Sequence, residues 1–165
     1  MTDGPPQPRA FTDYDASLRV AWEEEIEGEA YFLRLAEAHD GRAAEALTLL
    51  AEIEAVTARA LAPALRRRCV PMADLDALRA RGRAAAEPLA GMAWPDLAAW
   101  MAENFAPFIA EFEALEALGP PEDAEALRVA TDHERAAVAF AAAEAAGDPD
   151  SFRPLRDFLA QTAAP

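Results

Sequence analysis

Four glutamates lie where helical periodicity turns a residue toward an apolar face: Glu29, Glu54, Glu111 and Glu134. A carboxylate buried on its own is costly, so each would need a partner, a proton or a metal ion. If the four met at one level of a helical core they would repel one another, and divalent cations would relieve that repulsion. Oxygen ligands of this kind suit iron, manganese, calcium or magnesium. The spacing therefore predicts a carboxylate metal site.

A simpler interpretation of the same glutamates has to be weighed beside this one. The chain has 30 acidic residues, so some of them fall on apolar stripes without any chemical role. Arginines such as Arg59 or Arg135 would then pair with them. His133 directly precedes Glu134 and points about 100° away round the helix. We expect it at the periphery of the site, or simply packed near Asp132.

Other chemistries find little support in the composition. Cys69 is the single cysteine, which excludes an internal disulfide and a cysteine-rich zinc site. All 15 basic residues are arginine, so lysine Schiff-base and phosphate-loop chemistry are absent. His39 and His133 are the only histidines, and no Ser-His-Asp arrangement, glycine-rich loop or Cys-x-x-Cys motif is present. Any general acid or base would be mainly a carboxylate.

The charge balance argues against two classes of partner. The net charge is −15 and the isoelectric point about 4.4, so the surface would repel nucleic acids and anionic membranes. The N-terminal stretch lacks the pattern of a signal peptide, and no apolar run approaches a membrane span. We expect a cytoplasmic protein, and the arginine and alanine bias suggests a GC-rich bacterial source.

The elements that must position these glutamates are helices. Alanine-rich runs and few β-branched residues favour helix throughout. Residues 1–12, rich in proline, read as a flexible arm, and 13–165 as one domain. Stop signals at Gly41, Pro71, Gly119 and Gly147 delimit the segments. The expected helices span 15–39, 42–68, 72–87, 95–118 with a kink at Pro107, 122–146, and a short C-terminal helix at 151–161.

A weak internal repeat relates the two halves of the chain. The run AEAL at 44–47 recurs at 124–127, and the same offset places Glu54 on Glu134. Two successive helical hairpins, joined by a long crossover over 72–93, are the favoured plan.

This plan resembles the ferritin-like superfamily, including the rubrerythrins, over residues 15–146. In its metal-binding members the first and third helices each supply a glutamate, and the second and fourth each supply Glu-x-x-His. The resemblance implies that Glu29 and Glu111 match the lone glutamates, and that Glu54 and Glu134 match those of the paired motif. It implies iron or manganese as the metal. The histidine positions, however, hold Thr57 and Ala137.

Two hypotheses follow. In the first, an all-α, ferritin-like four-helix bundle binds one or two divalent metals through the core glutamates, with enzymatic activity left open. In the second, the bundle binds no metal and acts as a protein-interaction or assembly module, as a homodimer joined through an alanine-rich face. The inward glutamates favour the first hypothesis, and the missing histidine pair favours the second. Neither hypothesis specifies a substrate.

Overall fold

The computed structural model describes residues 12–163, and it confirms an all-α chain. Apart from residue 12, the expected N-terminal arm lies outside the described residues. No strand occurs in the part that is described, and no helix there is long and apolar enough to cross a membrane. The helices are α1 (Tyr14–Ala36), α2 (Gly41–Arg67), α3 (Leu75–Ala86), α4 (Trp94–Asn104), α5 (Ala106–Leu118), the 3-10 turn η1 (Pro121–Asp123), α6 (Ala124–Ala145) and α7 (Arg153–Thr162).

Local sequence signals account for the main boundaries. The Asp13 carboxylate accepts a hydrogen bond from the Ala16 N–H and caps α1. Gly41 takes a positive φ of 56°, where a side chain would be strained, and opens α2. Pro63 lies on the exposed side of α2 and does not end the helix, which continues to Arg67.

The segment expected as one kinked helix at 95–118 is two helices. A bend at Phe105 separates α4 from α5. Pro107 follows in the first turn of α5, where its missing N–H costs nothing. Within a continuous helix a proline ring crowds the carbonyl four residues earlier, a strain that α2 contains at Pro63 and that the bend at Phe105 avoids for Pro107. The break turns the aromatic residues around it toward the interior site described below.

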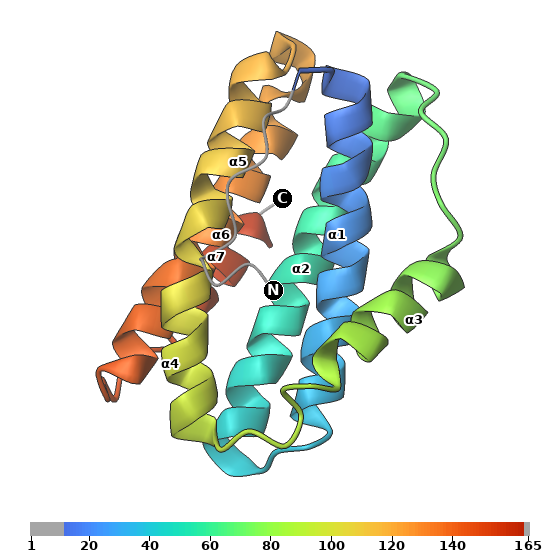
Figure 1. The fold of residues 1–165 in the computed structure, drawn as a ribbon. Coiled ribbons are helices and arrows are strands. Elements are labelled where there is room, and N and C mark those ends of the chain that lie inside the picture. The colour runs from blue at the N-terminus through green and yellow to red at the C-terminus, as the bar shows by residue number, and fades with distance from the viewer. Residues whose placement is uncertain (1–11, 164–165) are drawn as a thin grey trace.

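The helices form two neighbouring antiparallel pairs (Figure 1). α1 packs on α2, and α6 packs on α4 and α5. The connection that holds α3 returns along α1, so that α4 begins at the end of the molecule where α2 begins. α3 approaches α1 closely because Gly82 has no side chain, and a Cβ there would overlap the carbonyl oxygen of Glu27. α7 packs against α6 and α2.

The hydrophobic core is divided into two clusters along the length of the helices. One cluster contains Phe32, Leu50 and Phe140, and the other contains Leu18 and Leu61. Each long helix passes from one cluster to the other, and polar side chains occupy the level between them. The site described next lies at that level.

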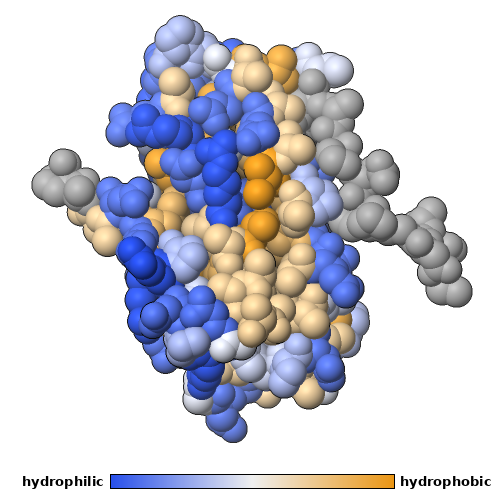
Figure 2. All heavy atoms as spheres, turned by 90° about the vertical axis from the view of Figure 1, so that its left-hand side faces the viewer, coloured by the Kyte–Doolittle hydropathy of each residue, from blue (hydrophilic) through white to orange (hydrophobic). Residues whose placement is uncertain are grey.

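One side of the surface carries an apolar band. Figure 2 faces the side of the molecule that α4 to α7 form, and there an apolar band runs lengthwise between hydrophilic margins.

Candidate metal centre

Two carboxylates and an imidazole converge where the core is interrupted. Glu25 of α1, Glu54 of α2 and His133 of α6 each place one possible ligand atom within 4.8 Å of the others. The His133 Nε2 atom lies 3.5 Å from Glu25 Oε2 and 3.6 Å from Glu54 Oε1. A third carboxylate follows at 3.7 Å, from Nε2 to Oε1 of Glu134. Three helices from both halves of the chain thus supply the cluster.

Heptad spacing explains why Glu25 points inward. It lies seven residues after Leu18 and seven before Phe32, and both of those residues are buried. The Glu25 side chain is itself only 1% exposed. Its Oε2 atom is buried and has no hydrogen-bond partner, which is an expensive arrangement for a carboxyl group.

The imidazole of His133 is held in one orientation. Its Nδ1 atom lies 2.8 Å from the Ala130 carbonyl oxygen, which can only accept a hydrogen bond. Nδ1 therefore carries the proton, and in the neutral ring Nε2 is left with its lone pair directed at the carboxylates. The Phe112 ring packs edge-to-face on the imidazole at 5.7 Å between centroids. Metal-binding histidines also have one ring nitrogen hydrogen-bonded to the backbone, which orients the other nitrogen toward the ligand site. Here Nε2 faces the three carboxylates, and a metal ion would replace the proton that their charge keeps on it.

Gly28 makes room for one of the acids. A Cβ at this position of α1 would lie 2.5 Å from Glu54 Oε2 and 2.8 Å from the carboxyl carbon. The absence of a side chain lets the Glu54 carboxylate approach the α1 backbone. A glycine inside a helix costs up to about 1 kcal/mol relative to alanine, so this space has an energetic cost.

Burial and mutual repulsion keep protons on the cluster. Burial raises the pKa of Glu25 well above its usual range; His133 lowers it, and Glu54 adds to the rise. Burial also raises the pKa of Glu134 to about 7, despite the opposing effect of His133. For His133 burial lowers the pKa, but the neighbouring carboxylates, Glu25 foremost, outweigh that effect and raise it well above normal. At neutral pH, without another cation, protons neutralise part of the acid charge.

The four glutamates predicted from the sequence to lie together are not all at the cluster. Glu54 and Glu134 both line the cavity at the cluster. Glu111 is buried on α5, and its charge contributes to the raised pKa of Glu134. Glu29 does not join them: it is half-buried and lines a separate surface hollow with Trp22 and Arg79, among α1, α2 and α3.

Two residues of the cluster were not assigned this place from the sequence. Glu25 replaces Glu29, and the Leu18–Glu25–Phe32 heptad is the signal that would have found it. His133 was expected at the periphery but lies among the carboxylates, and is 1% exposed. At the histidine positions of the ferritin-like pattern, the Thr57 hydroxyl donates a hydrogen bond to the Ile53 carbonyl oxygen, and Ala137 lines the cavity.

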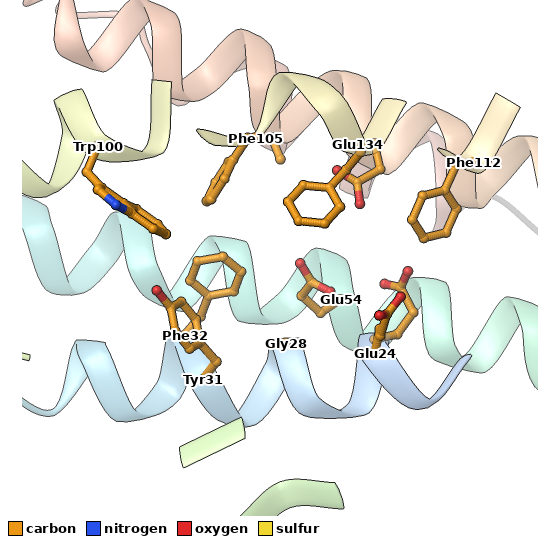
Figure 3. A pocket seen from close by; sticks show the side chains of 12 residues that line it. Glu24, Gly28, Tyr31, Phe32, Glu54, Trp100, Phe105, Phe112 and Glu134 are labelled. Carbon is orange, nitrogen blue, oxygen red and sulfur yellow. The ribbon is translucent and has the colours of Figure 1, made fainter. Parts of the chain in front are cut away.

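A cavity of about 310 Å³ adjoins the cluster. Figure 3 shows carboxylates and aromatic rings gathered in its wall, with Trp100 and Phe105 toward one end and Glu54 and Glu134 further along. Its complete lining is Glu24, Glu25, Gly28, Tyr31, Phe32, Glu54, Trp100, Phe105, Phe108, Phe112, Glu134 and Ala137. The centre is thus reachable from a largely apolar space.

Comparison with protein-family models, with curated proteins and with solved structures finds no match to this chain. The interpretation of the site therefore depends on its geometry.

Proposed function

We propose that this chain is a ferritin-like four-helix bundle protein that binds one divalent metal ion through Glu25, Glu54 and His133. The observation that carries the proposal is the Glu25 carboxylate. Its buried Oε2 makes no hydrogen bond and lies 3.5 Å, an ion-pair distance, from the Nε2 atom of His133, whose ring is already oriented by the backbone. A metal ion between these groups would give the oxygen a direct ligand bond and neutralise the clustered charge.

The donor set fits iron or manganese. Two carboxylates with one imidazole make a mainly oxygen site, which suits these metals, and zinc is the competitor that the same ligands would accept. Glu134 lies beside the trio, and Gly28 leaves the space that the Glu54 carboxylate occupies. A bound ion would supply Lewis-acid or one-electron chemistry at the wall of the cavity.

The arrangement of helices supports the ferritin-like part of the proposal. The chain forms two antiparallel helix pairs joined by a long crossover (Figure 1), and α1, α2 and α6 contribute acids, which is the arrangement that the proposal requires. The site departs from the common pattern because its one imidazole precedes Glu134 instead of following it by three residues. That departure favours a single ion over the usual pair.

A second candidate function is assembly without metal. The apolar band on the side of α4 to α7 favours it, since an extended apolar surface is typical of an interface (Figure 2). In this case a second copy of the chain would cover the band, and protons alone would neutralise the acids.

Metal binding by the purified protein tests the first function against the second. The protein is freed of metal with a chelator and then titrated anaerobically with Fe(II) or Mn(II). We expect one ion per chain and a higher melting temperature, because a ligand at 100 times its Kd stabilises by about 2.7 kcal/mol. Glu25→Gln and His133→Phe should abolish the uptake, whereas Glu29→Gln, in its separate hollow, should leave it unchanged. A folded protein that takes up no ion would refute metal binding, and sedimentation would then test assembly.

A further inference from the structure

The cavity beside the proposed metal site has two chemically different ends (Figure 3). At one end Trp100, Phe105, Tyr31 and Phe32 face one another across the space. At the other end the carboxylates of Glu24, Glu54 and Glu134 lie on opposite walls, and the ring of Phe112 lies beside them. An apolar body and a polar group would therefore be bound in different parts of a single cavity.

The aromatic end is a preformed surface. Phe32 makes an edge contact with Tyr31 at 5.1 Å between centroids and another with Phe105 at 6.2 Å. Trp100 continues the series with an edge contact to Phe105 at 6.3 Å. Burial raises the pKa of Tyr31 to about 12, so its hydroxyl stays neutral. Rings that hold one another in place lose little freedom when a ligand arrives.

Apart from Tyr31, the ionisable side chains that line the cavity are all carboxyl groups, and protons neutralise part of their charge at neutral pH. Four glutamates line it, and none of the described residues in its wall is basic. The proposed metal trio uses Glu25 and Glu54, and the cavity is also lined by Glu24 and by Glu134, whose Oε1 lies 3.7 Å from His133 Nε2. An anionic ligand would meet like charges in a poorly hydrated cavity, where such repulsion is stronger than in water.

We propose that this cavity binds a small amine, whose ring-sized apolar body lies against Trp100 and Phe105 and whose ammonium group lies at Glu24 and Glu134. Aromatic faces attract cations, and carboxylates offset the cost of removing an ammonium group from water. A volume of about 310 Å³ is at the small end for ligand pockets, which limits the body to about one ring system. The inference rests on the proposed function only in placing the amine beside the metal ion, because the walls of the cavity would hold it in either case.

Three probes of one shape and different charge test the ligand class. Benzylamine, benzyl alcohol and benzoate are titrated calorimetrically into the full chain at pH 7, both Mn(II)-loaded and metal-free. We expect benzylamine to bind about tenfold more tightly than benzyl alcohol, since tenfold corresponds to about 1.4 kcal/mol and a hydrogen bond to a charged group contributes about 1.5–3 kcal/mol. Benzoate should be the weakest of the three.

Matched variants separate the two ends of the cavity. Trp100→Ala should weaken benzylamine and benzyl alcohol alike, and Phe108→Ala serves as a second test of the same wall if the first variant does not fold. Glu24→Gln should remove the preference for the amine while leaving the affinity for the alcohol unchanged. Glu103→Gln, on the exposed side of α4, controls for the loss of one acid and should bind all three probes as the parent does.

The outcomes distinguish the two proposals. The amine site would be overturned if benzoate bound as tightly as benzylamine. It would also be overturned if the two single variants, Trp100→Ala and Phe108→Ala, both bound the probes as the parent does. Metal uptake without any discrimination among the probes would overturn it as well, and leave the metal site standing. Amine binding that depends on Trp100 and Glu24 in a chain that takes up no metal would support the ligand class and refute the metal function.

Discussion

Replacing Glu134 by glutamine should stabilise the metal-free protein at neutral and higher pH. The carboxyl group lies near the negative charges of Glu24, Glu54 and Glu111, and burial is the main cause that raises its pKa from 4.5 to about 7. Each pH unit of such a change corresponds to about 1.4 kcal/mol, so the ionised form costs about 3 kcal/mol in the folded state. Glutamine keeps the shape of the protonated side chain and carries no charge.

The sign of the pH dependence follows from linkage. The folded protein holds the Glu134 proton more tightly than the unfolded chain does, so the contribution of Glu134 to stability falls as the pH rises from about 4.5 to about 7. Above pH 7 the loss is complete. The advantage of Glu134→Gln over the parent should therefore be small near pH 4.5 and approach about 3 kcal/mol near pH 8.

Denaturant unfolding followed by circular dichroism, in a chelating buffer between pH 4.5 and 8, measures this difference. The free energy of unfolding of the parent is subtracted from that of the variant at each pH, so that the contributions of the other acids cancel. Glu103→Gln provides the exposed control, for which the difference should stay near zero across the range. A constant difference between Glu134→Gln and the parent would refute the reasoning, and a variant less stable at pH 8 would show that the ionised carboxylate has a favourable partner.

Three further predictions concern the same centre and its supports. Gly28→Ala places a methyl group 2.5 Å from Glu54 Oε2, and should lower Mn(II) affinity at least about tenfold in a titration while the helical content is unchanged. Metal binding at pH 6.5 should release protons, because the raised pKa values of Glu25 and His133 keep the cluster protonated before the ion binds. Calorimetry in buffers of different ionisation enthalpy counts the released protons. If no proton is released, the assigned protonation is wrong. Gly82→Ala should destabilise the fold by about 1–3 kcal/mol, because the added Cβ would overlap the Glu27 carbonyl. Denaturant unfolding measures the change, and an unchanged midpoint would mean that α3 packs only loosely on α1.

The helical framework could be predicted from the sequence because its signals are local. Alanine content favoured helix, Gly41 and Gly147 marked ends, and Pro107 predicted a kink close to the bend that divides α4 from α5. Glu54 and Glu134 were found for a similar reason, since α2 and α6 each carry an apolar stripe with one acid near its middle.

Glu25 and His133 could not be found as securely because their surroundings depend on tertiary packing. α1 is covered by α3 as well as by α2 and α5, so its apolar arc is wide. Counting buried positions from Trp22 and Ile26 places Glu29 on the side of the helix that faces α3. Counting seven residues on from Leu18 places Glu25 on the side that faces the interior. For His133, periodicity gave a direction but could not show that α1 and α2 place carboxylates there.

The crossover connection has a consequence for the order in which the molecule assembles. Glu25 and Glu54 belong to helices joined by a short loop, whereas His133 is separated from them by the whole of α3 to α5. Contacts close in sequence form at a lower entropic cost, so we expect the first helix pair to form early and to present two acids without their imidazole. The trio is then complete only after α6 docks. A bound ion would join the first and second halves of the chain late in folding, and it would slow unfolding by opposing the departure of α6.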